Sequence, residues 1–159
     1  MDTCKDIATQ MGSGTYLDND ESETSIDITK YQGMINSLLY LMASRPDIMF
    51  SVCLYARFQA CLKESHLTVA KRIMKHLQET SNADLWYPKG SICSLVGFSD
   101  ADYSGCKKDM KITSGTCHIF GNALVSWSCK KKASVALSTA EAKYITVGSC
   151  CAQILWLKQ

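Results

Sequence analysis

The sequence lacks the features that mark secreted and membrane-spanning proteins. Its longest apolar run, residues 38–43, is far shorter than the ~18 apolar residues that indicate a membrane-spanning helix. Its first ten residues, MDTCKDIATQ, have an acid at position 2 and no apolar stretch behind a basic start, so they do not match a secretory signal. We therefore expect an intracellular protein, in the cytoplasm or the nucleus, that is not secreted and has no membrane partner.

An excess of charge of one sign is missing as well. The chain has 17 Lys and Arg residues against 15 Asp and Glu residues, a formal net charge of +2. This is well short of the basic surface expected of a stand-alone nucleic-acid-binding protein, so net charge neither requires nor excludes nucleic acid as a partner. Of the 159 residues, 47% are hydrophobic and 20% charged, which is typical of a globular protein that can build a core.

Metal-ligand spacing is absent despite nine cysteines. No C-x-x-C pair occurs, and the three histidines, His66, His76 and His118, do not fall at ligand spacing from cysteine pairs. Cys150 and Cys151 are adjacent, which is a poor geometry for a structural disulfide. The cysteines are therefore expected to be reduced thiols that pack as small hydrophobic side chains.

The first half of the chain predicts helices. Residues 1–28 show no sustained hydrophobic period and are expected to form an irregular lead-in. From residue 29 the apolar residues recur at steps of three and four, which is typical of amphipathic helices. The pattern predicts one helix from residue 29 to about Ser44, a second that begins at Pro46, and a third from about Ser65 to Leu77. On the third helix the residues expected to face inward are His66, Ala70, Ile73, Met74 and Leu77.

The second half predicts an antiparallel sheet and one long helix. The hydrophobic period becomes two, and the strands expected are a buried strand at residues 95–99, a second at 112–120 and a third at 124–129, with a hairpin turn at Gly121-Asn122. Ser138 and Glu141 form an S-x-x-E capping box that begins the helix. Its apolar residues are expected to share one inward face: Tyr144, Ile145, Gly148, Ala152, Leu155 and Trp156. Trp86 and Trp156 are expected in the core. The fold class predicted is α+β.

Two segments of this half contain candidate functional residues. In FSDADYSG, Asp100 and Asp102 are two residues apart on a strand, so both side chains point the same way and can bind a divalent cation through oxygen ligands. The alternative is a turn that uses aspartate to bond its own backbone. Trp127, followed by Lys130, Lys131 and Lys132, is a candidate contact for phosphates, and the alternative there is a solvated charge run.

Five separated segments together resemble the end of a copia-type retrotransposon Pol polyprotein of the plant type. They are YQGMINSLLYLMASRPDIMFSV, ARFQACLKESHLTVAKRIMKHL, LVGFSDADYSGC, TSGTCHIFGNALVSWSCKK and VALSTAEAKY. The likeness covers residues 4–159. It implies that residues 29–90 are the helical tail of a reverse transcriptase, its thumb or connection region. Residues 91–159 are then the first part of a ribonuclease H-like domain, with three antiparallel strands and one helix.

The resemblance also implies a chemistry. In this family an RNA/DNA hybrid is cut by clustered carboxylates that hold two Mg²⁺ ions. Asp100 matches the aspartate of the first strand. A second carboxylate lies near the start of the long helix in a motif of the form S-x-x-E-A-E-Y, which here reads STAEAKY, so Glu141 is retained while Lys143 occupies the favoured glutamate position. A third aspartate, on a strand after this helix, is not reached by residue 159, so a truncated domain is expected.

We expect Lys143 to cause a loss of catalytic activity. At ~4 Å and an effective dielectric constant of ~20, two unit charges interact by about 4 kcal/mol, so a cation beside divalent ions strongly opposes metal binding. We expect a degenerate, catalytically inactive Pol fragment that does not bind Mg²⁺ productively. Two alternatives stay open: an active ribonuclease H when the segment is joined to the remainder of the Pol polyprotein, and a non-enzymatic module that binds nucleic acid or protein.

Overall fold

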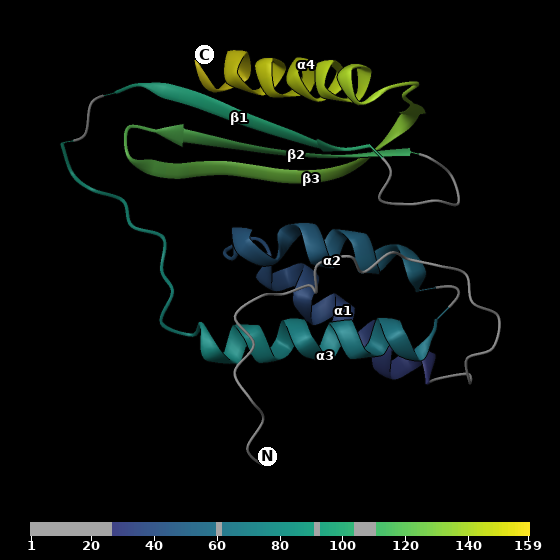
Figure 1. Cartoon of the computed structure of the whole chain (residues 1–159). Helices are drawn as coiled ribbons and strands as arrows, with labels where there is room; N and C mark the ends of the chain where they lie inside the picture. Colours follow the sequence, from purple (N-terminus) through teal and green to yellow (C-terminus); the bar gives the residue numbers. More distant parts are fainter. Residues whose placement is uncertain (1–26, 60–61, 91–92, 104–110) are drawn as a thin grey trace. The chain divides into compact units, whose positions relative to one another are not determined.

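The structure is a computed structural model that describes residues 27–59, 62–90, 93–103 and 111–159. The expected lead-in therefore lies outside the described residues except for its last two. The elements run in the order α1 (Ile28–Leu41), η1 (Pro46–Ile48), α2 (Met49–Tyr55), η2 (Ala56–Phe58), α3 (Glu64–Glu79), β1 (Leu95–Asp102), β2 (Lys111–Phe120), β3 (Ala123–Val135) and α4 (Thr139–Leu157), as Figure 1 shows. The predicted α+β class, with helices first and an antiparallel sheet after them, is confirmed.

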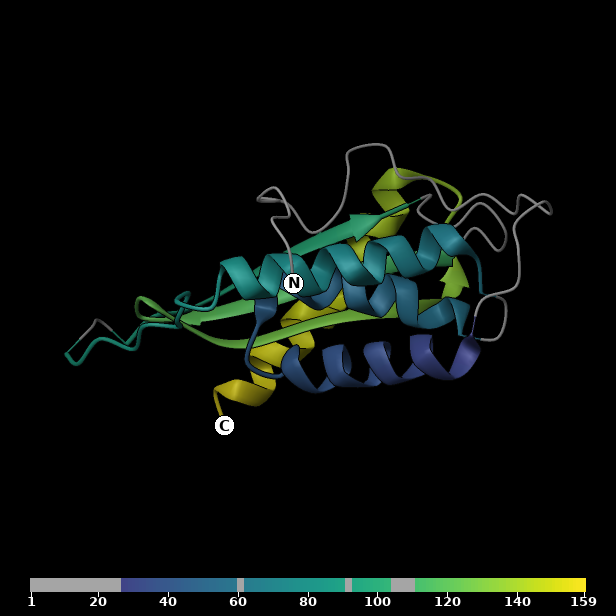
Figure 2. The same cartoon turned by 90° about the horizontal axis from the view of Figure 1, so that it is seen from below.

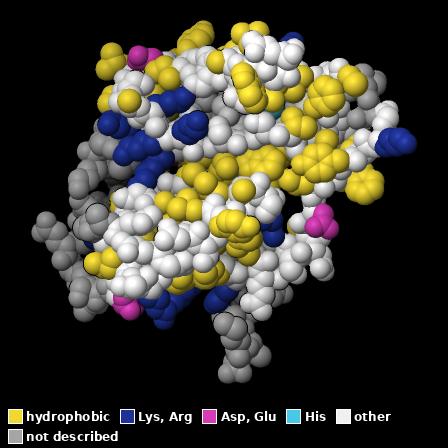
Figure 3. Space-filling view, turned by 180° about the vertical axis from the view of Figure 1, so that it is seen from behind, with side chains coloured by type: hydrophobic (Ala, Val, Ile, Leu, Met, Phe, Trp, Pro, Cys, Tyr) yellow, Lys and Arg dark blue, Asp and Glu magenta, His cyan; other side chains and the backbone are white. Residues whose placement is uncertain are grey.

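The described residues form two compact units, one ending at Ala83 and the other beginning at Asp84. None of the helices in the described part of the chain has the length and apolar character that a membrane crossing needs. Many large apolar side chains are nevertheless exposed, and yellow atoms are spread over the face drawn in Figure 3.

The first unit is a cluster of helices, drawn in Figure 2, and its buried apolar side chains form a small core. α1 begins at residue 28 because the carboxylate of Asp27 accepts hydrogen bonds from Thr29 N at 3.0 Å and Lys30 N at 3.3 Å. The residues that share its inward face are spaced by four and three positions, and all are fully buried: Tyr31, Ile35 and Leu38.

The other helices of this unit complete the core. The buried apolar residues that they supply are Ile48, Val52, Tyr55, Ala70 and Ile73. His66 packs as expected, with its ring centroid 4.6 Å from that of Phe58 and its ring in a T-shaped arrangement with that of Tyr55. Met74, which was expected to face inward, is 37% exposed. It follows Ile73 directly, and a step of one residue turns the side chain by about 100° around a helix.

The second unit is a three-stranded antiparallel sheet in the order β1-β2-β3, with α4 on one face (Figure 1). A tight hairpin joins β2 to β3 at Gly121-Asn122, as predicted. Gly121 has a positive φ of 62°, a conformation that glycine adopts without steric cost. The register places Phe98 opposite Cys117 and Cys117 opposite Trp127.

Within the second unit α4 covers one face of β1 and the described side chains on its other face are exposed, so the expectation of a buried strand is wrong for that face. Gly97 lies against α4, because a Cβ placed on it would be 2.7 Å from Cys150 Sγ and 2.6 Å from Ile154 Cδ1. Val96 and Phe98 alternate with Gly97 and are 45% and 54% exposed. A single helix covers one side of a sheet, and antiparallel sheets tolerate this arrangement.

The face of α4 that packs on the sheet agrees with the expected one at Ile145, which packs against a buried cluster that includes Ile112 and Ala142, and otherwise differs from it. The buried residues are small and spaced by four positions: Ala142, Thr146 and Cys150. Small side chains let the helix approach the strands closely, and the hydroxyl of Thr146 is satisfied by donating to Ala142 O at 3.0 Å. Tyr144 and Leu155, which were predicted to be inward, are 79% and 67% exposed.

The two tryptophans expected in the core are exposed as well. Trp86 is 81% exposed and Trp156 is 65% exposed. Trp86 lies in residues 80–90, which form neither helix nor strand, and Trp156 lies in the last turn of α4. Hydrophobicity alone predicted burial for both, whereas burial requires a packed neighbour on the same side.

Candidate functional site

The two aspartates of β1 project from the face of the sheet that α4 leaves open. Asp100 is three residues after Gly97, which faces α4, so strand alternation places its side chain on the opposite face. Asp100 pairs with Gly115 and Asp102 with Thr113 in the register. The carboxylate of Asp100 is exposed, and its Oδ1 accepts a hydrogen bond from Ala101 N at 2.8 Å.

Glu141 has a structural role at the start of α4. Its backbone N donates to Ser138 Oγ at 3.2 Å, and its own Oε2 accepts from Leu137 N at 2.7 Å. The predicted N-cap at Ser138 is confirmed, whereas the Glu141 carboxylate bonds Leu137 N instead of the Ser138 N expected in a capping box. Lys143, two residues further on, is exposed.

The carboxylates do not form a metal centre in the part of the chain that the structure describes. There, no group of three or more His, Cys, Asp or Glu side chains lies together in a way that would hold a metal ion. The Mg²⁺ pair implied by the resemblance requires clustered carboxylates. Asp100 and Asp102 face away from α4, the Glu141 carboxylate is bonded to Leu137 N, and Lys143 brings a positive charge. These residues do not fit two Mg²⁺ ions.

A group of lysines lies at the same end of the sheet as the aspartates. Lys130 and Lys131 are exposed on β3, and the Nζ of Lys132 donates to Ser149 Oγ on α4. The register puts Lys131 opposite Thr113, which in turn pairs with Asp102. Trp127, predicted to act with these lysines, is partly buried on the face that α4 leaves open.

A histidine and a cysteine meet between the sheet and α4, and the sequence did not predict this contact. His118 of β2 is 1% exposed, and its Nε2 lies 3.3 Å from Cys150 O and 3.5 Å from Cys150 Sγ. Desolvation, with smaller contributions from the neighbouring thiols Cys151 and Cys117, raises the pKa of the Cys150 thiol. A buried thiol with a raised pKa is a poor nucleophile, and this contact packs α4 against β2.

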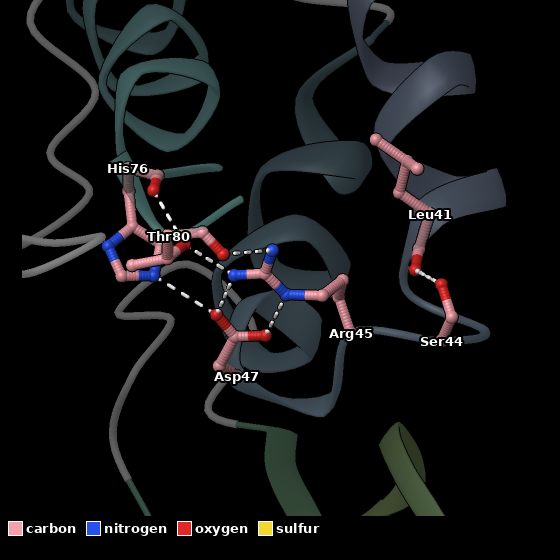
Figure 4. A network of polar contacts seen from close by, with 6 residues as sticks. All are labelled: Leu41, Ser44, Arg45, Asp47, His76 and Thr80. Carbon is pink, nitrogen blue, oxygen red and sulfur yellow. Dashed lines mark hydrogen bonds and ion pairs between the residues drawn. The ribbon is translucent and has the colours of Figure 1, made fainter. Parts of the chain in front are cut away.

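The first unit contains a polar network that sequence analysis also missed (Figure 4). Arg45 binds the carboxylate of Asp47 in a bidentate manner, through Nε at 3.0 Å and NH2 at 2.8 Å, and His76 Nε2 lies 3.0 Å from the same carboxylate. Arg45 NH1 also donates to Thr80 O at 3.1 Å. The network fastens the start of η1 to the end of α3. The sequence signal was the Arg-Pro-Asp triplet, in which the proline fixes the backbone between the two charges.

This network predicts a dependence of stability on pH. The hydrogen bonds from Arg45, aided by His76 against the opposing effect of partial burial, lower the pKa of Asp47 from 3.8 to about 2. A lowered carboxyl pKa adds stability that is fully present above the unfolded-state pKa and is lost as pH falls through the folded-state value. Because the Asp47 side chain is 35% exposed, solvent screening reduces this contribution to about 1 kcal/mol.

We therefore expect Asp47→Asn to be less stable than the wild type at pH 5 and about equally stable at pH 2. Thermal melts of both proteins at pH 5, 4, 3 and 2, followed by circular dichroism, measure the difference. The difference in melting temperature between the two proteins should narrow between about pH 4 and pH 2. A gap that keeps its size throughout this range would show that ionisation of Asp47 contributes nothing.

Comparison with known proteins identifies several relatives of the chain. No protein-family model matches it, and no solved structure is significantly similar. The retrovirus-related Pol polyprotein from transposon RE1 of Arabidopsis thaliana is 35% identical over 157 residues, 99% of this chain and 11% of that protein. The corresponding polyprotein from transposon TNT 1-94 of Nicotiana tabacum is 34% identical over 130 residues, 81% of this chain and 10% of that protein. Secreted RxLR effector protein 161 of Plasmopara viticola is 31% identical over 128 residues, 80% of this chain and 90% of that protein.

The chain aligns over nearly its whole length within much longer transposon polyproteins. It is related to segments of the retrovirus-related Pol polyproteins of plant transposons. It spans 11% of the length of the RE1 polyprotein. The predicted Pol resemblance is thus confirmed, whereas the assignment to ribonuclease H stays a prediction.

Proposed function

We propose that residues 29–90 derive from the tail of a reverse transcriptase and residues 91–159 from the start of a ribonuclease H-like domain that no longer hydrolyses RNA. The observation that carries the proposal is the arrangement of the second unit. It is an antiparallel meander whose first strand ends in exposed Asp100, followed by one long capped helix. The partners proposed are an RNA/DNA hybrid and the remainder of a Pol polyprotein.

Two features of the carboxylate set support inactivity. The Glu141 carboxylate is already bonded to a backbone N–H at 2.7 Å, so metal binding would compete with the start of the helix. Lys143 places a positive charge two residues later on α4, and a cation at about 4 Å from a divalent ion costs several kcal/mol even at an effective dielectric constant of ~20. Both features weaken Mg²⁺ binding rather than the fold.

The test is a cleavage assay of this chain with Mg²⁺ and a labelled RNA/DNA hybrid. We expect no cleavage above the background without protein, for the wild type and for Asp100→Asn alike. Cleavage by the wild type that Asp100→Asn abolishes would overturn the proposal. A contaminating nuclease is recognised because it would act equally in both preparations.

The alternative of an active enzyme within a longer polyprotein is tested by restoring the carboxylate. Lys143→Glu is compared with the wild-type segment, each placed in the otherwise unchanged RE1-type polyprotein context. We expect hydrolysis only with Lys143→Glu. Equal hydrolysis by the two would mean that Lys143 does not impair the site and that Glu141 serves as the metal ligand.

A further inference from the structure

The side of α4 that faces away from the sheet presents a regular row of exposed residues (Figure 1). On the inward side the buried residues are Ala142, Thr146 and Cys150. On the outward side six residues follow one another at steps of 3, 4, 3, 4 and 3 positions, which keeps them on one face of a helix. We call them the α4 stripe, and all six are exposed: Glu141, Tyr144, Gly148, Cys151, Leu155 and Lys158.

The middle of the α4 stripe is uncharged, and its two ends carry charges of opposite sign. The side chains of Tyr144 and Leu155 are 79% and 67% exposed, and a Cβ placed on Gly148 would have no other atom within 4 Å. Lys158 directly follows the helix and keeps helical backbone angles, φ −88° and ψ −10°. A helix that is apolar on several sides is normally covered on more than one of them, so the stripe has the character of a contact surface.

The spacing of the α4 stripe fits an antiparallel second copy of the same helix. Because the steps are the same from either end, a two-fold axis midway between Gly148 and Cys151 brings every member opposite another member. Gly148 then lies opposite Cys151 of the second copy, and Tyr144 lies opposite Leu155. The two small residues are at the centre, where the helix axes can approach closely, and the large side chains pack on either side of them.

Charge favours the antiparallel orientation over the parallel one. The same two-fold axis places Glu141 opposite Lys158 of the second copy, at both ends of the contact. A parallel pair would place each of these charges beside its own like charge and would align the two helix dipoles. The Glu141 carboxylate can accept several hydrogen bonds, so its bond to Leu137 N does not prevent this pairing. Exposed ion pairs contribute at most about 1 kcal/mol, so they fix the orientation more than the affinity.

The apolar area of this side of α4 is at the lower end of what a dimer needs. Val147 and Ala152 flank the stripe, are exposed, and lie opposite each other under the same two-fold axis. With Tyr144, Cys151 and Leu155 they supply on the order of 500 Å² per copy, or about 1,000 Å² per pair, close to the minimum for a specific interface. The expected dimer is therefore weak and reversible, with a dissociation constant on the order of 10–100 µM.

We propose that the chain forms an antiparallel homodimer through the α4 stripe. The contact uses the outward side of α4, whereas Asp100 projects from the face of the sheet that α4 leaves open. Association therefore does not involve the carboxylate of β1. The inference goes beyond the proposed function and does not depend on it.

The experiment is sedimentation equilibrium of the full chain, with a reductant, from about 1 to 200 µM. Leu155→Glu is expected to weaken the dimer at least tenfold, because it places a charge opposite Tyr144 at two sites of each pair. The matched control is Trp156→Glu, which changes the charge equally at the adjacent residue, 65% exposed but about 100° further around the helix. It should change the dissociation constant by less than about twofold. An equal loss in both variants would indicate non-specific association of apolar surfaces and would overturn the inference.

A second pair of variants tests the orientation. Lys158→Glu places like charges opposite each other at both ends and should weaken the dimer by about fivefold at low salt. The loss should shrink at high salt, because exposed charges are screened. Glu141→Gln/Lys158→Glu removes the repulsion and keeps an acceptor for Leu137 N, so it should recover most of the affinity. A Lys158→Glu variant that associates as strongly as the wild type at low salt would contradict the antiparallel arrangement.

Cys151 provides an independent readout, because the two copies of this exposed thiol lie near the two-fold axis. A short bis-maleimide should join the wild type into a covalent dimer. Cys151→Ala should remove most of this product, whereas Cys93→Ala, which removes an exposed thiol outside α4, should not. A wild type that is monomeric at every concentration would overturn the inference and mean that a different partner covers the stripe. Circular dichroism melts identify variants that fail to fold, and if Leu155→Glu is one of them, the cross-link and the Lys158 variants decide.

Discussion

Tyr31→Ala is expected to lower the free energy of unfolding of the helical unit by about 3–5 kcal/mol, the range for removing a large buried aromatic side chain. The Tyr31 side chain is fully buried between the helices. Its hydroxyl donates to Tyr55 O at 2.9 Å, so the substitution removes core volume and leaves a buried carbonyl without this donor. Urea unfolding followed by circular dichroism measures the loss.

Two single-atom changes separate the hydrogen bond from the packing. Tyr31→Phe keeps the ring and should cost about 1 kcal/mol, because only the bond to Tyr55 O is lost. Tyr55→Phe removes a buried hydroxyl that has no partner among the described residues, so it should be neutral or slightly stabilising. Equal losses in the two variants would contradict the role given to the Tyr31 hydroxyl.

Gly97→Val is expected to destabilise the sheet unit by about 1–3 kcal/mol, as overpacking of a core usually does. A Cβ at this position would lie 2.6 Å from Ile154 Cδ1 and 2.7 Å from Cys150 Sγ. Ile154 is able to rotate away, but Cys150 is short and buried against the sheet, so α4 must shift. The expected result is a lower melting temperature of this unit and weaker contact of His118 with α4.

The control for Gly97 lies on the helix that packs against it. A Cβ placed on Gly148 of α4 would have no other atom within 4 Å. Gly148→Ala should therefore raise stability by about 1 kcal/mol, the difference in helix propensity between the two residues. A loss of stability for Gly97→Val together with a gain for Gly148→Ala would support the close packing of α4 on β1 at Gly97. A loss of stability in both would mean that the close approach of α4 at Gly97 is not what sets the two positions apart.

The sequence predicted the elements better than the faces they bury. The three strands, the hairpin at Gly121-Asn122 and the capped helix from Ser138 follow from local patterns, because turn and cap chemistry act over a few residues. The inward face of α4 was wrong because the helix is apolar on several sides. Which side packs was decided by the missing Cβ of Gly97 and the small side chains of Ala142 and Thr146.

In the candidate site, too, local motifs predicted individual residues but not the contacts between residues far apart in the sequence. Asp100 and Glu141 were singled out by motif, and the bond of Glu141 to the helix start followed from capping alone. The contact between His118 and Cys150 joins residues 32 positions apart, and the bond between Asp47 and His76 spans 29 positions. Nothing in a local window indicates such pairs, because they depend on how helices and strands pack.

The double use of Glu141 affects how related chains are interpreted. Its carboxylate holds Leu137 N, and its backbone N binds Ser138, so any chain that needs this helix to begin here benefits from a glutamate at this position. The cap alone accounts for such a glutamate, so its presence in a sequence does not by itself indicate hydrolysis. Lys143 is exposed and takes no part in these two bonds, so a substitution there tests the chemistry without disturbing the cap.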